Sequence, residues 1–223
     1  MIKIENLEAQ IDDFNTDYTL QIKSHELSAI IGKSGAGKST LLNLIAGFNK
    51  SRHGSIYIND FNATNTPPSE RPISSLFQEN NLFSHLNVQD NIALAINPNL
   101  KLNIKELDEL HQSLLAVGMS EKIKSMTNVL SGGERQRVAL ARSIVSKKNI
   151  LLLDEPLSQL DPHLRKDMLR LIKKIKEERN LTVIMVVHTP EEVIEYVDNF
   201  IQIDNGRVIK SIKPNELDIA NVY

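Results

Sequence analysis

The first residues of the chain alternate between apolar and polar side chains. This alternation covers residues 3–7 and 18–22, on either side of a polar stretch at residues 12–17. It predicts two strands joined by a loop. Apolar runs predict further strands at residues 27–31, 55–58, 73–77, 150–153, 182–187, 200–203 and 207–212. The runs at 150–153 and 182–187 are typical of strands buried on both faces of a sheet.

Helical spacing of apolar residues appears between these strands. Residues 41–48 predict a helix, and residues 88–124 predict a helical insert because Leu107, Leu110, Leu114 and Val117 recur at steps of three and four. A later amphipathic helix is expected to point Leu164, Met168, Leu171 and Ile175 inward.

The connecting segments carry turn residues. Residues 62–71, rich in Asn, Thr and Pro, predict a surface loop, and Asp204-Asn205-Gly206 predicts a hairpin turn. The expected fold is therefore α/β, with a β-rich N-terminal edge and an inserted helical subdomain.

Length and composition narrow the class of protein. A chain of 223 residues fits one domain with an embedded subdomain. Its net charge of −2 argues against a nucleic-acid partner, and the absence of cysteine argues against disulfides and thiolate metal sites. The longest apolar run, residues 181–187, is far shorter than the ~20 residues of a membrane span, and we expect no export signal.

A phosphate-binding motif follows the predicted strand at residues 27–31. The pattern G-x-x-x-x-G-K-[ST] occupies Gly32, Lys33, Ser34, Gly35, Ala36, Gly37, Lys38 and Ser39, and Thr40 follows it. The glycines allow successive N–H groups to face one concavity, and the helix N-terminus adds a positive dipole end. We expect Lys38 to reach the β- and γ-phosphates of ATP, Ser39 to bind Mg²⁺ and Thr40 to contact the α-phosphate.

Two carboxylates end the predicted strand at residues 150–153. Asp154 and Glu155 should face the crevice at the carboxyl end of the sheet, where ligands bind in α/β folds. Asp154 is expected to hold Mg²⁺, and Glu155 is expected to act as the general base toward the attacking water.

A second glycine motif begins another helix. Ser131, Gly132 and Gly133 lie in the stretch LSGGERQR, where Ser131 is expected to cap the helix and leave N–H groups for an anion. With GKSGAGKST, LSGGERQR and LLLDEP in this order, together with Gln78 and His188, the chain resembles the ATP-binding subunits of ABC transporters over nearly its whole length.

This resemblance implies a P-loop NTPase (RecA-like) core with an N-terminal antiparallel β edge. Residues 1–223 would form a single ABC ATP-binding domain, in which 1–77 and 147–223 form the β edge and core and about 78–146 form the helical subdomain with the Ser131 motif. It implies a head-to-tail dimer with ATP between the phosphate loop of one copy and Ser131, Gly132 and Gly133 of the other. Gln78 would touch Mg²⁺ and the attacking water, and His188 would contact the γ-phosphate.

Two positions depart from the family pattern. Members of the family carry an aromatic residue after the first strand that stacks on adenine, whereas Ile11 occupies this position here. Phe14 is the nearest aromatic residue that could replace it, and Tyr18 is a less favoured alternative. Gln159 departs from the usual S-A-L-D dimer-contact loop, which leaves the detail of that contact open.

The resemblance extends to a subgroup of importers. Residues 41–48, 67–72, 76–86 and 97–102 resemble the ATP-binding subunits of thiamine importers of Gram-negative bacteria. It implies two membrane-spanning permease subunits or halves, an indirect periplasmic binding protein, and a peripheral position on the cytoplasmic face of the inner membrane. Leu82 and Phe83 would contact the permease. An importer of another small nutrient and an exporter motor are the alternatives, and a soluble ABC ATPase is the less favoured one.

Overall fold

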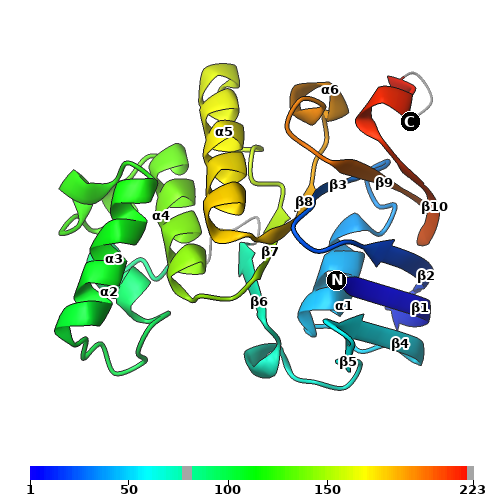
Figure 1. Cartoon of the computed structure of the whole chain (residues 1–223), viewed down its shortest axis with the longest axis horizontal. Helices are drawn as coiled ribbons and strands as arrows, with labels where there is room; N and C mark the ends of the chain where they lie inside the picture. The colour runs from blue at the N-terminus through cyan, green and yellow to red at the C-terminus, as the bar shows by residue number, and fades with distance from the viewer. Residues whose placement is uncertain (77–81, 220–223) are drawn as a thin grey trace.

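The computed structural model describes residues 1–76 and 82–219, and these form one ten-stranded sheet with helices packed on it (Figure 1). The strands are β1 (Ile2–Ile11), β2 (Phe14–Ile22), β3 (Leu27–Ile31), β4 (His53–Ile58), β5 (Phe61–Asn62), β6 (Ile73–Leu76), β7 (Ile150–Asp154), β8 (Thr182–Val186), β9 (Asn199–Asp204) and β10 (Arg207–Ile212). The α-helices are α1 (Lys38–Ala46), α2 (Val88–Ala93), α3 (Ile104–Ala116), α4 (Gly132–Val145), α5 (Pro162–Arg179) and α6 (Pro190–Val193). Every strand expected from the sequence is present, and Phe77, the last residue of the strand expected at 73–77, lies outside the described residues.

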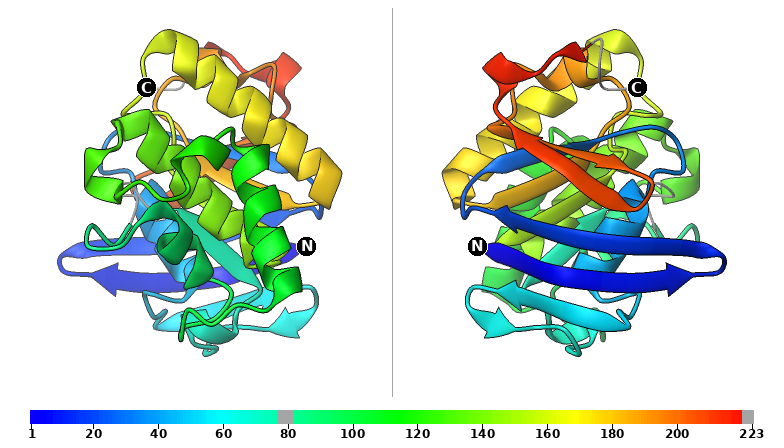
Figure 2. Two further views of the ribbon diagram at one scale, coloured as in Figure 1. Left: turned by 90° about the vertical axis from the view of Figure 1, so that its left-hand side faces the viewer. Right: turned by 90° about the vertical axis from the view of Figure 1, so that its right-hand side faces the viewer.

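The sheet changes character across its width. Its order is β5-β4-β1-β2-β10-β9-β3-β8-β7-β6. Strands β5, β4, β1 and β2 pair antiparallel, and the strands from β9 to β6 pair parallel. Figure 2 shows the antiparallel strands crossing one side of the molecule, with α1 behind them. The mixed sheet confirms the expected α/β core with an N-terminal antiparallel edge.

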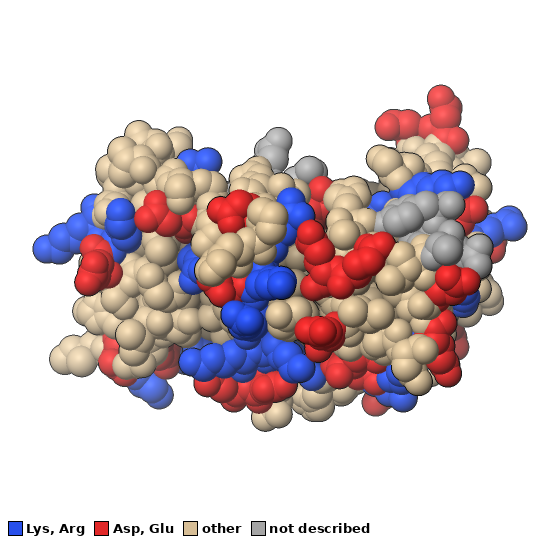
Figure 3. Space-filling model, turned by 90° about the horizontal axis from the view of Figure 1, so that it is seen from above, with Lys and Arg blue, Asp and Glu red and all other residues tan. Residues whose placement is uncertain are grey.

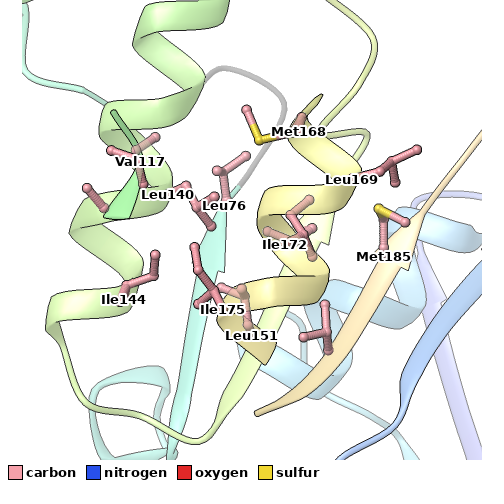
Figure 4. Close-up of a cluster of buried hydrophobic side chains, with 14 of the residues drawn as sticks. Leu76, Val117, Leu140, Ile144, Leu151, Met168, Leu169, Ile172, Ile175 and Met185 are labelled. Atoms are coloured by element: carbon pink, nitrogen blue, oxygen red, sulfur yellow. The ribbon is translucent and has the colours of Figure 1, made fainter. Parts of the chain in front are cut away.

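The central strands are buried on both faces because they separate two hydrophobic clusters. Leu151 and Leu153 of β7 belong to the cluster that also contains residues of α2, α3, α4 and α5, shown in part in Figure 4. Ile150 and Leu152 belong to the cluster that contains residues of α1 and the antiparallel strands. Alternate side chains of one strand thus fill two cores, which explains its uninterrupted apolar sequence.

The loop expected at residues 12–17 is only a two-residue turn. Strand β1 continues to Ile11, which pairs with Phe14 at the start of β2, and the turn residue Asp12 has a φ of 52°. Thr16 and Tyr18, two residues apart in β2, both face the core. Their β-branched and aromatic side chains favour a half-buried strand, although the residues around them are polar.

Residues 62–71 are expected to form a surface loop, but this expectation is wrong for two residues near its ends. Ala63 is 1% exposed and Arg71 is 2% exposed. The Arg71 guanidinium donates Nη1 bonds to the carbonyls of Leu44 and Ile45 at the end of α1, as well as bonds to the carbonyls of Thr64 and Thr66. A buried cation is tolerated here because carbonyl oxygens surround it.

The inward position expected for Leu164 is also wrong. Met168 and Ile175 are buried in the core, whereas Leu164 is 37% exposed. Leu164 lies in the first turn of α5, beyond the end of the core, and its Cδ1 would lie 3.6 Å from a Cβ atom placed on Gly133. It therefore belongs to the surface around the second glycine motif.

No α-helix among residues 1–76 and 82–219 is long and apolar enough to cross a membrane. The face seen from above carries charges of both signs, with Lys and Arg gathered near the middle and Asp and Glu beside them (Figure 3).

Candidate nucleotide site

The phosphate loop leaves the carboxyl end of β3 and enters α1. Gly32 has a φ of 145°, and a Cβ atom there would lie 2.1 Å from the carbonyl oxygen of Ile203. Gly37 has a φ of 102°, and a Cβ atom there would meet the Tyr18 hydroxyl at 2.4 Å. Both positions therefore require glycine, and the backbone curl that the motif predicts is present.

Lys38 is folded back on this loop. Its Nζ atom donates 2.8 Å hydrogen bonds to the carbonyl oxygens of Gly32 and Lys33, and the residue is 6% exposed. Burial lowers the pKa of the Lys38 ammonium, while the nearby carboxylates of Glu155 and Asp154 oppose this shift. Phosphate oxygens would replace neutral carbonyls with charged partners, which favours anion binding.

Ser39 and Asp154 form a hydroxyl and carboxylate pair beside the loop. The Ser39 hydroxyl donates a 3.1 Å hydrogen bond to Oδ1 of Asp154. Asp154 is 8% exposed, and burial raises the pKa of its carboxyl group despite the bond from Ser39. A hard divalent cation prefers oxygen ligands of these two kinds, so the donor set fits Mg²⁺.

Glu155 and His188 meet at the ends of neighbouring strands. Glu155 follows β7 and His188 comes two residues after β8, and His188 Nε2 lies 2.5 Å from Glu155 Oε1. Glu155 has a φ of 51°, which is unusual for a residue other than glycine and is found more often at functional positions.

These groups surround one hollow of about 210 Å³, which we call the phosphate hollow. Its lining consists of Phe14, Ser34, Gly35, Gly37, Lys38, Ser39, Thr40, Glu155 and His188. The fold thus brings the phosphate loop, Glu155 and His188 together from distant parts of the chain, and Asp154 joins them through its bond to Ser39.

The second glycine motif lies at a different place in the chain. Ser131 caps α4, because its Oγ accepts a bond from the Glu134 N–H while a Glu134 carboxylate oxygen accepts one from the Ser131 N–H. A separate hollow of about 380 Å³, which we call the signature hollow, is lined by Ser131, Gly133, Glu134, Arg137, Leu160, Leu164 and Met168. Within one copy, Ser131 and Gly133 therefore line a different hollow from Lys38.

The remaining expected residues fall in three places. Gln78 lies outside the described residues. Gln159 lies beside the signature hollow, where its Oε1 would be 3.6 Å from a Cβ atom on Gly132. Ile11 does not line the phosphate hollow, whereas Phe14 does.

Sequence reasoning missed Arg165 and missed the contact that Tyr18, considered there only as a stacking residue, makes with the phosphate loop. Tyr18 is fully buried, and its hydroxyl donates a bond to the Gly37 carbonyl. Arg165 lies in the first turn of α5 and joins the Glu155 loop to Glu192. Neither has a sequence motif, although Tyr18 stands out as an aromatic residue on the core face of its strand.

This geometry agrees with a comparison against protein families. A family model described as ABC transporter matches residues 16–158. The chain belongs to the ABC transporter family and is an ATPase of the ATP-binding cassette type.

Named relatives lie close in sequence. The thiamine import ATP-binding protein ThiQ of Haemophilus influenzae is 51% identical over 191 residues, covering 86% of this chain and 89% of the relative. The protein of the same name from Shigella sonnei is 44% identical over 217 residues, covering 97% of this chain and 94% of the relative.

Solved structures show the same fold. An ATP-binding cassette of an ABC transporter in its ADP conformation superposes with a TM-score of 0.89 at 23% identity, covering 97% of this chain and 92% of that one. A dimeric bacterial ABC transporter cassette superposes with a TM-score of 0.84 at 28% identity, covering 97% of this chain and all of that one.

Proposed function

We propose that the chain is the ATP-hydrolysing subunit of an importer whose cargo is thiamine. The observation that carries this proposal is the 44–51% identity to thiamine import ATP-binding proteins over most of both chains. The phosphate hollow supports the ATPase part independently, because its lining contains an anion-binding loop, a buried lysine and Glu155, and Asp154 bonds to Ser39 at its wall.

ATP binding would use the phosphate loop. The Lys38 ammonium would exchange the carbonyls of Gly32 and Lys33 for the β- and γ-phosphate oxygens, while loop N–H groups bind the remaining oxygens. Ser39 and Asp154 would hold Mg²⁺, which neutralises phosphate charge when bound, and Gln78 is a further expected ligand.

Hydrolysis would depend on Glu155. A water oxygen bonds to the γ-phosphorus as the bond to the bridging oxygen breaks, and the Glu155 carboxylate accepts the water proton. Glu155 Oε1 contacts His188, so a turn of His188 toward the γ-phosphate would leave this oxygen to the water.

A second copy would complete the site. Ser131, Gly132 and Gly133 line or border the signature hollow rather than the phosphate hollow, so a head-to-tail partner would bring their N–H groups to the γ-phosphate. The exposed Leu164 beside this hollow would then be covered. The dimeric cassette among the structural relatives makes this arrangement sterically reasonable for the fold.

The membrane partner would be a pair of permease subunits or halves, with a periplasmic binding protein that selects the cargo. Such a complex would hold the chain on the cytoplasmic face of the inner membrane. Phe83 is 47% exposed and borders a hollow of about 380 Å³ lined by residues of β6 and α4. Leu82 is only half-buried and packs partly against the core, so Phe83 is the better test residue for this contact.

The test is uptake of labelled thiamine by cells that lack the chain and then regain it. We expect uptake to return with the wild-type chain and to remain absent with Lys38→Ala or Glu155→Gln. Phe83→Asp should retain ATPase activity in the purified chain and lose uptake.

Other nutrients measured in the same cells separate the alternatives. Normal thiamine uptake with failure of a different nutrient would contradict the cargo and retain the ATPase. Increased accumulation of a compound in the deleted cells would instead identify an exporter.

A further inference from the structure

Glu155 and His188 lie on two separate loops, and a second contact joins these loops. The first loop, residues 155–161, runs from Glu155 to the start of α5. The second, residues 187–192, contains His188 and the start of α6. Besides the contact between Glu155 and His188, Arg165 and Glu192 connect these two segments.

Arg165 makes this connection with two different atoms. Its Nε donates a 2.8 Å hydrogen bond to the Leu160 carbonyl in the first loop. Its Nη1 donates a 2.8 Å bond to Oε1 of Glu192 in the second loop. The guanidinium is planar, so one side chain sets the position of the two loops relative to each other.

A hollow separates the loops at this point. It measures about 210 Å³, and its lining consists of Glu155, Leu157, Ser158, Arg165, Val186, Val187, His188, Thr189 and Glu192. Close packing normally holds neighbouring segments in place, but empty space has no contacting atoms. The polar bridge therefore carries more of the positional constraint than it would in a filled interior.

The pair is partly sheltered from solvent. The side chains of Arg165 and Glu192 are 29% and 33% exposed. Two fixed hydrogen bonds from one guanidinium distinguish this bridge from an ordinary exposed ion pair, which holds geometry weakly.

We propose that Arg165, bound to Glu192, is a positioning residue for ATP hydrolysis that holds the Glu155 loop and the His188 segment at their working separation. The inference rests on the proposed roles of Glu155 and His188. When His188 turns toward nucleotide, its contact with Glu155 is lost, whereas the bridge uses neither group and can persist. Displacing a reacting group by about 1 Å can cost up to 100-fold in rate.

The test is steady-state ATPase activity of the full chain with four variants. Arg165→Ala should lower kcat by about tenfold or more and leave KM for ATP within about twofold, because the phosphate loop is intact. Glu192→Ala should lower kcat several-fold, and Glu192→Gln should lose less because its amide oxygen still accepts a bond from Nη1. The double variant Arg165→Ala with Glu192→Ala should be no slower than Arg165→Ala alone.

Arg170→Ala is the matched control. Arg170 lies on the same helix, is 69% exposed, and contacts only Asp167 at 3.5 Å among the ion pairs of the described residues. Its kcat should equal that of the wild type. Thermal melting of every variant, measured in the same buffer, separates slow turnover from loss of folded protein.

Some results would overturn the proposal. An unchanged kcat in both Arg165→Ala and Glu192→Ala contradicts it, as does a strictly multiplicative loss in the double variant. If Arg165→Ala does not fold, the comparison of Glu192→Ala with Glu192→Gln decides, and equal kcat values there overturn it.

Glu155→Gln, measured alongside, separates this inference from the proposed function. Loss of turnover in Glu155→Gln with normal turnover in Arg165→Ala overturns only the positioning role. Normal turnover in Glu155→Gln overturns the catalytic assignment and the positioning role with it.

Discussion

The Tyr18 hydroxyl donates a 2.8 Å hydrogen bond to the carbonyl oxygen of Gly37, the residue immediately before Lys38. Tyr18 belongs to the antiparallel strand β2 and is fully buried, whereas Gly37 caps the helix that begins the phosphate site. The antiparallel edge of the sheet therefore supports the phosphate loop directly.

Tyr18→Phe should weaken ATP binding and stability together. The Gly37 carbonyl keeps its bond from the Leu41 N–H, so losing the Tyr18 bond should cost about 1 kcal/mol and loosen the loop. We expect the Kd for ATP, measured by calorimetry, to rise about fivefold. Tyr57→Phe, in strand β4 of the same sheet, is the control and should change neither quantity.

Tyr18 also predicts an alkaline pH dependence. Burial raises the pKa of the folded-state hydroxyl far above the value of 10.0 expected in the unfolded chain. The unfolded state therefore releases this proton first, and the contribution of Tyr18 to stability is present below about pH 10 and is lost as the pH rises further. The difference in melting temperature between wild type and Tyr18→Phe should shrink above pH 10, and a constant difference up to pH 11 would contradict this account.

Asp154→Asn should stabilise the chain without nucleotide. Burial raises the pKa of the Asp154 carboxyl, so folding favours its protonated form, and its ionisation opposes folding at neutral pH. The stability that comes with the protonated form is present below the unfolded pKa and is lost as the pH rises through the folded pKa. Asparagine keeps an oxygen for Ser39 and carries no charge, so its melting temperature at pH 7 should exceed that of the wild type.

This gain should disappear as the pH falls below the unfolded value of 3.8, where the carboxyl is protonated in the folded and the unfolded chain alike. ATPase activity should be lost in Asp154→Asn at every pH. A variant that melts below the wild type at pH 7 would show that the carboxylate contributes more through its contacts than burial costs.

Arg71→Met should destabilise the fold without acting on chemistry. It removes four hydrogen bonds to carbonyl oxygens, of which the two at the end of α1 are buried. We expect a loss of about 2–4 kcal/mol in the free energy of unfolding, measured with urea. Arg71→Lys keeps the charge but reaches fewer carbonyls, so its free energy of unfolding should lie between those of the wild type and Arg71→Met. A loss below about 0.5 kcal/mol in Arg71→Met would show that the bonds from Arg71 to the last carbonyls of α1 do not stabilise the fold.

Phe14 is the candidate base-stacking residue. It borders the phosphate hollow, and its Cε1 would lie 3.1 Å from a Cβ atom on Gly37. Phe14→Ala should weaken ATP binding by about tenfold, since stacking on an aromatic ring contributes about 1–3 kcal/mol. Ile11→Ala is the control and should have little effect.

Comparing ATP with GTP sharpens this test. Because the phosphate contacts are shared, the two affinities of the wild type should lie within roughly tenfold of each other, a gap of ~1.4 kcal/mol. A strong preference for ATP that survives Phe14→Ala would contradict stacking by Phe14.

The parts of the fold that could be predicted are those that local sequence determines. The strand at residues 27–31 and the glycine motif after it are adjacent in the chain, so pattern and motif support each other. The burial of Ala63 and Arg71 and the exposure of Leu164 could not be predicted in the same way, because each depends on how distant elements pack. Arg71 is buried only because α1 ends beside it.

The same distinction applies to the site. The sequence identifies Lys38, Ser39, Asp154, Glu155 and His188 as candidates, and the structure places all five near one another. Their roles remain predictions. The bridge from Arg165 to Glu192 could not be predicted, since neither residue has a motif and the contact depends on how α5 and α6 are placed.

The pairing of Ile73 with Ile150 has a consequence for folding kinetics. These residues are neighbours in the sheet, yet α2, α3 and α4 lie between them in the chain. Closing such a long segment carries an entropic cost, and contacts of high sequence separation form slowly. Helices α3 and α4 contact each other locally and can form before this closure. Prior collapse of these helices would shorten the effective distance that β6 and β7 must bridge, so mutations in the α3 and α4 contact should slow refolding rather than accelerate unfolding.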